Sequence, residues 1–367
     1  MKAIAITPGK GNPHLIDIPE PQIMSPYQIK LQVLQVGICG TDREEAAGGR
    51  ADAPEGKNRL VIGHEMFGRV VETGTSVTEV KEGDYAIFIV RRGCGQCYPC
   101  LNGRSDMCYT GKYTERGIRK LDGYQAEYVV DNEEYILRIP DEIAHIGVLT
   151  EPMSVVEKAI DESLLLQISR LPGMEVSTWL KGKQALVAGL GPIGLLAAVI
   201  LKLRGANVLG LDIVDENSQR PKLLKEIGGR YINGTKVQTT KIDDEYGKMD
   251  IIVEATGIAK LEFELLDALG INGIYVLTGI PSGERPVTIL GNDIMRKMVL
   301  MNHLLLGSVN ASLHHYQLAI GDLAKANEQW GSTISSLITH KFRYTNFENA
   351  LLKHPSDEIK SVIVWNE

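Results

Sequence analysis

Short runs in which apolar and polar residues alternate fill the N-terminal part of the chain. Residues 29–37, IKLQVLQVG, and residues 68–74, GRVVETG, are of this kind, and glycine and proline separate such runs up to about Val130. A period of two is typical of half-buried strands, and frequent turn residues between short strands are typical of a barrel-like sheet. The pattern predicts a β-rich first domain over residues 1–152.

The pattern changes near Pro152 to alternating helices and strands. Residues 154–170 are expected to form a helix that stops before Pro172 and Gly173. The strands predicted after this helix are 184–190, 207–213, 250–256 and 273–280. Apolar strands separated by helical segments indicate a parallel sheet covered on both faces, and we expect this second domain over residues 153–305.

The remaining segment, residues 306–367, is predicted to return to the first domain. A helix-like stretch at 313–329 precedes an apolar strand, SVIVW, at 361–365. The predicted fold class is therefore α/β, with a β-rich domain and a doubly wound parallel-sheet domain.

Composition and charge narrow the range of functions. The 367 residues include 39 lysines and arginines against 46 aspartates and glutamates, a net charge of −7 without long runs of either sign. Nucleic acid is therefore not an expected partner. No apolar stretch approaches the roughly 18 residues of a membrane span, and the first residues lack the apolar core of a signal peptide. We expect a cytoplasmic protein that does not bind a membrane.

Four of the five cysteines lie on one short loop. They are Cys94, Cys97, Cys100 and Cys108. The odd total and the clustering favour a metal site over a disulfide framework. The regular spacing is typical of a closed, structural zinc site, with an iron–sulfur cluster as the alternative. We expect the neighbouring Arg91 and Arg92 to offset the negative charge of such a site.

A glycine-rich turn follows the predicted strand at 184–190 and opens a helix. It consists of Gly189, Leu190, Gly191, Pro192, Ile193 and Gly194. In a dinucleotide-binding turn the glycines permit the tight bend, the approach of a pyrophosphate and close helix packing, and the helix N-terminus favours the anion. A plain glycine-rich turn is the alternative. Asp212 at the end of the next strand favours dinucleotide binding, because an acid there can bind ribose hydroxyls.

Asp212 also bears on which dinucleotide binds. A carboxylate repels a 2′-phosphate and favours NAD, whereas the nearby Arg220 and Lys222 leave NADP as an alternative. A purely structural role, in which Asp212 caps the following segment, is also open.

The fifth cysteine, Cys39, and the pair His64-Glu65 are candidates for a second metal site. A lone cysteine or histidine is more often a buried core residue than a ligand. Together with Glu151, these residues could supply sulfur, nitrogen and carboxylate ligands to a zinc with room for substrate or water.

Several motifs, in their order along the chain, resemble the zinc-containing medium-chain dehydrogenase/reductase superfamily. They are GICGTD (37–42), GHEMFG (63–68), the four-cysteine loop and GLGPIG (189–194). Others resemble the archaeal-type glucose dehydrogenases within it: RRGCGQC (91–97), YTERGI (113–118), LTEPMSVVEKA (149–159) and GSVN (307–310). The resemblance implies a GroES-like catalytic domain, an inserted Rossmann domain, and a homo-oligomer, either a dimer or a tetramer.

The resemblance also implies a set of site residues. It places a catalytic zinc at Cys39, His64 and Glu65, with Glu151 as a nearby fourth ligand, in addition to the structural zinc. The substrate residues that it implies are Thr41 for the reacting hydroxyl, Glu115 and Glu151 for sugar hydroxyls, and Asn310 beside both nicotinamide and sugar. Some sugar-oxidising relatives carry asparagine where this chain has Val90, which is a departure that bears on sugar scope.

The implied reaction is oxidation of an aldose, first of all D-glucose, at C1 to the aldonolactone with hydride transfer to NAD(P)⁺, NAD being preferred. A zinc-dependent dehydrogenase of sorbitol, another polyol or threonine is the alternative within the superfamily. A non-catalytic nucleotide-sensing protein is the alternative from another class.

Overall fold

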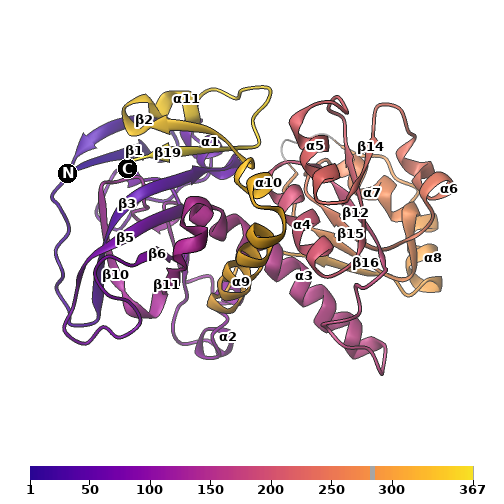
Figure 1. The fold of residues 1–367 in the computed structure, drawn as a ribbon, viewed down its shortest axis with the longest axis horizontal. Coiled ribbons are helices and arrows are strands. Elements are labelled where there is room, and N and C mark those ends of the chain that lie inside the picture. Colours follow the sequence, from indigo (N-terminus) through magenta and orange to yellow (C-terminus); the bar gives the residue numbers. More distant parts are fainter. Residues whose placement is uncertain (282–285, 367) are drawn as a thin grey trace. The chain divides into compact units, whose positions relative to one another are not determined.

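The computed structural model describes residues 1–281 and 286–366, and it divides into two compact units (Figure 1). Unit 1 comprises Met1–Ser154, Asn310–Asn327 and Ser335–Glu367. Unit 2 comprises Val155–Val309 and Glu328–Ile334. Each unit is thus assembled from segments that are distant in sequence.

Unit 1 is built mainly of strands. Their bounds are β1 (Lys2–Thr7), β2 (Gly11–Asp17), β3 (Gln28–Ile38), β4 (Leu60–Val61), β5 (Glu65–Thr73), β6 (Tyr85–Phe88), β7 (Arg91–Arg92), β8 (Thr114–Arg116), β9 (Lys120–Leu121), β10 (Tyr128–Asn132), β11 (Ile136–Ile139), β18 (Ile338–Arg343) and β19 (Lys360–Val364). The largest sheet has the order β11-β6-β5-β3-β19-β18, with β10 also paired to β3. Two small sheets, β2-β1-β4 and β7-β8-β9, accompany it.

The central strand β3 keeps one face in the core along its whole length. Leu31 and Val33 are buried at alternate positions, and after a register shift against β5 the buried positions become Val36 and Ile38. The shift acts as a β-bulge: the residues whose side chains point into the core change from odd-numbered to even-numbered positions. It brings the end of β3 to the core face just before Cys39.

Strand β19 lies between β3 and β18, although it comes from the opposite part of the sequence. It pairs antiparallel with β3, with Ser361 opposite Ile38, and parallel with β18. Figure 1 shows this yellow strand beside the indigo strands of the N-terminal segment. The C-terminal segment therefore completes the sheet that leads to Cys39.

The α-helices outside the parallel-sheet region are α1 (Gly40–Ala46), α2 (Tyr98–Leu101), α3 (Thr150–Arg170), α9 (Leu313–Trp330), α10 (Ser332–Ser335) and α11 (Phe347–Leu351). Of these, α3 runs from unit 1 into unit 2 at Val155. Helix α3 begins earlier than the predicted 154–170, because Pro152 occupies its first turn, where proline is tolerated. Glu151 is consequently a helical residue.

Unit 2 contains a sheet of six parallel strands. These are β12 (Gln184–Ala188), β13 (Asn207–Asp212), β14 (Arg230–Asn233), β15 (Met249–Glu254), β16 (Leu269–Leu277) and β17 (Leu304–Gly307). The helices of this unit after α3 are α4 (Pro192–Leu203), α5 (Gln219–Glu226), α6 (Ile242–Tyr246), α7 (Ala259–Glu264) and α8 (Gly291–Leu300). The strand order β14-β13-β12-β15-β16-β17 is that of a doubly wound dinucleotide-binding sheet. The predicted α/β fold class is confirmed.

The edge strands of this sheet, β14 and β17, were not among the predicted strands. Both are short, and β17 is half-buried at each of its three leucines. Strand β14 has polar residues at both ends, and the apolar run of β17 is only three residues long, so neither strand has the longer apolar run of the buried central strands. Across residues 1–281 and 286–366, no helix is long and apolar enough to cross a membrane.

Candidate functional site

Cys39 lies at the junction between β3 and α1, where it caps the helix. Its Sγ accepts a hydrogen bond from the Thr41 amide at 3.2 Å, and the Asp42 carboxylate accepts one from the Cys39 amide at 2.8 Å. This reciprocal capping box satisfies two amides of the first helical turn. The thiol is thus held in one direction by local backbone geometry.

The structure brings Cys39 together with His64 and Glu65. His64 directly precedes β5 and Glu65 is its first residue, and the Cys39 Sγ lies 3.2 Å from the His64 Nε2. One ligand atom from each of the three residues lies within 4.8 Å of the others. On the other side of the imidazole, Nδ1 is 3.5 Å from Asp42 Oδ1. A carboxylate in this place can fix the ring orientation of a metal-binding histidine.

Glu65 has a buried counter-ion for which the sequence shows no local signal. Lys360, the first residue of β19, forms an ion pair with Glu65 Oε2 and donates a hydrogen bond to the Ile38 carbonyl at 3.1 Å. Both side chains are about 2% exposed or less. Gly37 opposite Glu65 leaves the necessary space, since a Cβ there would lie 2.0 Å from Glu65 Oε2.

The chemistry of this set fits a cation. Buried acids surround it: Asp42 and Glu45 are fully buried in α1, and among residues 1–281 and 286–366 neither Glu45 oxygen has a hydrogen-bond partner. Burial raises the pKa of the Cys39 thiol. Burial alone lowers the pKa of the His64 imidazole, but the charges of Asp42 and Cys39 outweigh it and raise that pKa well above its usual range. A bound cation would favour the thiolate and the neutral imidazole that metal ligation requires.

Glu151 and Thr41 lie around this set without belonging to it. Burial and the nearby Glu65 raise the pKa of the Glu151 carboxyl to about 7, although His64 opposes the shift. Glu151 is not in the group of residues whose ligand atoms lie within 4.8 Å of one another. The Thr41 hydroxyl accepts a long hydrogen bond of 3.4 Å from Arg50.

Two predicted substrate residues, Glu115 on β8 and Asn310, contact each other directly. The Asn310 Nδ2 donates to Glu115 Oε1 at 2.6 Å. Asn310 has a φ of +65°, a left-handed conformation that asparagine adopts more readily than most residues. Arg91 on β7 also donates to Glu115 Oε1, from Nε at 3.0 Å and Nη2 at 2.8 Å.

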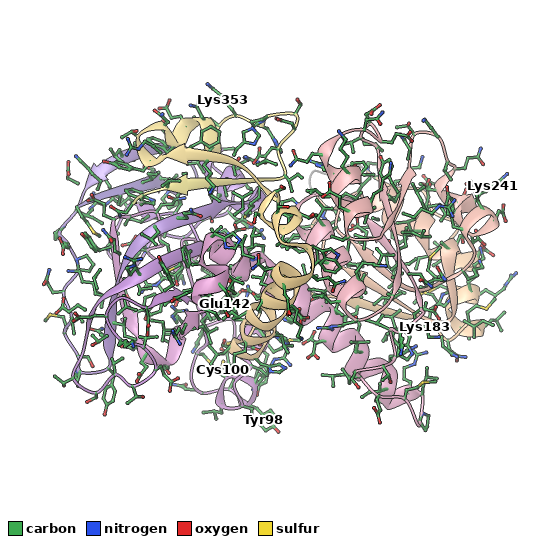
Figure 2. All side chains as sticks on the ribbon, in the orientation of Figure 1. Tyr98, Cys100, Glu142, Lys183, Lys241 and Lys353 are labelled. Atoms are coloured by element: carbon green, nitrogen blue, oxygen red, sulfur yellow. The ribbon has the colours of Figure 1, made fainter. Side chains whose placement is uncertain are left out.

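The four-cysteine loop forms a compact cluster around α2. The Sγ atoms of Cys94 and Cys100, and those of Cys97 and Cys108, are 3.9 Å apart, and all five cysteines of the chain are free thiols. Four sulfurs at about 2.3 Å from a tetrahedral zinc would lie about 3.8 Å from one another. A hydrogen bond with Thr110 lowers the pKa of the Cys94 thiol to about 6. The cluster therefore has the dimensions of a closed zinc site; Figure 2 labels Cys100 and the exposed Tyr98 in this lobe.

Arg91 and Arg92 were expected to offset the negative charge of a metal held by the four cysteines. In the structure both instead pair with carboxylates. Arg91 binds Glu115, and Arg92 binds Asp131, with Nη2 to Oδ2 at 2.6 Å. Both guanidinium groups are buried, and a buried charge needs a partner of fixed geometry. Residue spacing gave no signal for these pairs, because the partners lie on other strands.

In unit 2 the glycine-rich turn has the geometry expected of a dinucleotide-binding turn. Gly189 has a φ of +85°, and a Cβ on Gly194 would lie 1.7 Å from the Gly189 carbonyl oxygen. Gly191 caps α4, and a Cβ there would meet open space. The turn thus combines a sharp bend, close helix packing and an open approach to the helix N-terminus.

Asp212 braces this turn through its carboxylate. Oδ2 accepts from the Leu190 amide at 2.8 Å, and Oδ1 accepts from the Ile213 amide at 2.7 Å. Arg220 Nη1 lies 3.6 Å from Oδ2. Asp212 therefore links the ends of β12 and β13, and it also makes the local bond expected of a capping residue.

A cavity of about 650 Å³ lies elsewhere in unit 1. Its lining includes Tyr27, Glu133, Ile136 and Leu313, and it contains none of the predicted site residues. The candidate chemistry is therefore carried by the side-chain clusters described above.

Comparison with known proteins gives consistent matches over the whole chain. The family described as Glucose dehydrogenase C-terminus matches residues 144–365, and the Alcohol dehydrogenase GroES-like domain matches residues 25–141. Glucose 1-dehydrogenase of Methanocella arvoryzae is 33% identical over 99% of each chain, and glucose 1-dehydrogenase 2 of Vulcanisaeta moutnovskia is 36% identical over 99% of each. A solved structure of Haloferax mediterranei glucose dehydrogenase in complex with NADP, Zn and gluconolactone covers 100% of both chains at 33% identity, with a TM-score of 0.88.

Proposed function

The chain belongs to the glucose dehydrogenase family, and we propose that it oxidises D-glucose at C1 to gluconolactone with hydride transfer to NAD(P)⁺. The observation that carries the proposal is the set of Cys39 and the buried pair His64 and Glu65, whose ligand atoms lie within 4.8 Å of one another. Its sulfur, nitrogen and oxygen donors suit zinc. Relatives named glucose 1-dehydrogenase over the full length support the substrate.

We propose that two zinc ions bind each chain, one at Cys39, His64 and Glu65 with Glu151 nearby, and one at the four-cysteine cluster. When bound at the first set, zinc supplies a Lewis acid that lowers the pKa of the C1 hydroxyl. Around it, Asp42 holds the His64 ring and Lys360 holds the Glu65 carboxylate. Glu151, whose carboxyl pKa is raised to about 7, can accept a proton near neutral pH.

Glu115, Asn310 and Thr41 would bind the sugar. Oε1 of Glu115 is occupied by Arg91 and Asn310, which leaves Oε2 to accept a sugar hydroxyl. Thr41 next to the metal set can bond the reacting hydroxyl. A polyhydroxy substrate is favoured because an unmatched buried polar group costs about 1 to 3 kcal/mol.

Unit 2 is proposed to bind the dinucleotide, with the pyrophosphate at the turn from Gly189 to Gly194 and the adenosine ribose at Asp212. The fixed carboxylate of Asp212 supports NAD as the preferred cofactor, and Arg220 beside it keeps NADP as an alternative. We propose unit 1 as the catalytic domain. Its segments Met1–Ser154, Asn310–Asn327 and Ser335–Glu367 support the predicted bounds 1–152, 153–305 and 306–367, except that Glu328–Ile334 of the last segment belongs to unit 2.

The proposal is tested by initial rates with NAD and NADP across glucose, galactose, xylose, sorbitol and threonine, together with zinc analysis. We expect turnover of glucose and two zinc ions per chain. Activity confined to sorbitol or threonine would overturn the glucose assignment. One zinc per chain with no turnover of any substrate would favour a nucleotide-sensing protein.

We also propose that the chain forms a homo-oligomer, a dimer or tetramer, and acts in the cytoplasm. Five free thiols, four of them in a metal-site arrangement, support a reducing compartment. Light scattering of the purified protein measures the oligomeric state, and a monomer mass would contradict that part of the proposal.

A further inference from the structure

Arg91 joins two parts of unit 1 that have different tasks in the proposed function. Its Nε and Nη2 donate to Glu115 Oε1 at 3.0 and 2.8 Å, and its Nη1 donates to the Asp106 carbonyl at 2.8 Å. Asp106 lies in the short helix Ser105–Met107, between Cys100 and Cys108. One guanidinium therefore connects the backbone of the cysteine lobe to the proposed sugar-binding carboxylate.

The contacts of Arg91 determine which Glu115 oxygen remains free. Oε1 accepts two bonds from Arg91 and one from Asn310, and no hydrogen bond among the described residues uses Oε2. An acceptor that already has three donors has little capacity for another. The pairing thus leaves Oε2 as the acceptor for a ligand hydroxyl and holds the carboxylate in a single orientation.

Aromatic stacking fixes the plane of this guanidinium. The Arg91 Cζ lies 3.9 Å from the centroid of the Tyr113 ring, and the Arg119 Cζ lies 4.5 Å from the same centroid. A planar fork that stacks and donates three hydrogen bonds to two acceptors cannot be reproduced by a lysine ammonium. The side chain is buried, so its orientation is set by these partners.

We propose that Arg91 is a positioning residue that orients Glu115 toward sugar hydroxyls and makes this orientation depend on the folded cysteine lobe. The inference rests on the proposed function, because it takes Glu115 as a sugar ligand. It adds to that function a route by which the structural cluster affects sugar affinity without contacting the sugar.

The neighbouring Arg92 provides a matched control. It lies on the same two-residue strand, is equally buried, and its Cζ also lies 3.9 Å from a tyrosine ring, that of Tyr135. Its carboxylate partner, however, is Asp131, which Arg116 also binds, with Nη2 to Oδ2 at 2.6 Å. Loss of Arg92 therefore removes a comparable set of buried contacts without touching Glu115.

The test compares R91M, R91K and R92M in the zinc-loaded full chain. We expect R91M to raise the glucose KM roughly tenfold or more, the usual effect of losing a group that orients a ligand, while the KM of the dinucleotide stays unchanged. Calorimetric binding of gluconolactone should weaken by the same factor, and R91K should restore only part of it. R92M should lower the thermal midpoint and leave sugar affinity unchanged.

Two further variants test the route itself. In an E115Q background R91M should cause no additional loss of lactone binding, and C100S should weaken lactone binding in the wild type but not in R91M. Additive losses in either cycle would overturn the proposal, as would an unchanged glucose KM in R91M. Absence of glucose turnover by the wild-type chain would instead contradict the proposed function, so the two failures are distinguishable.

Discussion

At the residue scale, Cys39 combines two physical roles in one side chain. Its sulfur caps α1 through the Thr41 amide and also lies 3.2 Å from the His64 Nε2. Serine can replace the first role, since it is a good helix cap, but its hydroxyl is a poor zinc ligand at neutral pH. The two roles can therefore be separated by substitution.

We expect C39S to lose activity by at least roughly 100-fold, because a Lewis acid supplies several kcal/mol of charge stabilisation. The free energy of unfolding should change little, whereas C39A should cost about 1 kcal/mol more through the lost cap. C97S should instead lower the thermal midpoint through loss of the structural metal, while the metal at the first set stays in place. Zinc content, kinetics and thermal unfolding measure these effects, and the reverse pattern would contradict the division into two sites.

Asp212 allows a second prediction at this scale. D212N keeps an acceptor for the Leu190 amide but removes the charge that would repel a 2′-phosphate. A repulsion of about 1 kcal/mol corresponds to a shift of roughly fivefold in the ratio of kcat/KM for NADP over NAD. D215N, which changes an exposed acid three residues further on, is the control. An equal change for both cofactors in D212N would argue against the ribose role.

At the scale of elements, β19 brings a buried lysine to the proposed metal set of Cys39, His64 and Glu65. Lys360 pairs with Glu65, and burial of the lysine, which lowers its pKa, is outweighed by the Glu65 charge, so that the pKa is raised. The strand therefore contributes both backbone pairing to β3 and a charge to the site.

K360M should destabilise the metal-free chain by about 3 to 5 kcal/mol, because it leaves the Glu65 carboxylate buried without its partner. K341M on the neighbouring strand β18 is the control, since Lys341 is exposed. Adding E65Q to K360M should recover much of the loss. Denaturant unfolding measures these differences, and equal stabilities of K360M and K341M would be inconsistent with a buried ion pair.

Helices, strands and metal clusters that show as periodicity or regular spacing in a short stretch of sequence could be predicted. Contacts between residues far apart in the sequence could not. The helix at 313–329 and the central strands of unit 2 follow from periodicity, and the four-cysteine cluster follows from spacing. The proposed catalytic set needed a family resemblance, because Cys39 and His64 are 25 residues apart. Lys360 had no signal at all, since the Ile38 carbonyl that it binds is 322 residues away.

At the scale of the whole molecule, Glu45 makes stability depend on pH. Burial, with the Asp42 charge adding to it, raises the pKa of the Glu45 carboxyl to about 9. Below the ordinary carboxyl pKa, Glu45 is protonated in both the folded and the unfolded chain. The folded state then has its full stability, because no charge is buried. As pH rises toward 9 the unfolded chain has released this proton while the folded chain retains it, so stability falls.

We therefore expect E45Q to unfold with a weaker pH dependence than the wild type between about pH 4.5 and 9, with a difference of up to about 1.4 kcal/mol for each pH unit. Glutamine preserves the volume and stays neutral. E44Q, at the exposed residue beside it, should follow the wild type. Denaturant unfolding across this pH range is the measurement, and parallel curves for E45Q and wild type would rule out this contribution.

The place of β19 between β3 and β18 has a consequence for biosynthesis. Translation runs from the N-terminal side, so residues 360–364 leave the ribosome after residues 155–309. The sheet strands of unit 2 are contiguous in the chain and can assemble first. In β3, β10 pairs with residues 28–32, but residues 35–38 lack their partner until β19 is made. Unit 1, whose strands are translated first, is thus completed after unit 2. We therefore expect this short edge to need protection in the nascent chain, and activity to appear only after translation has passed Val364.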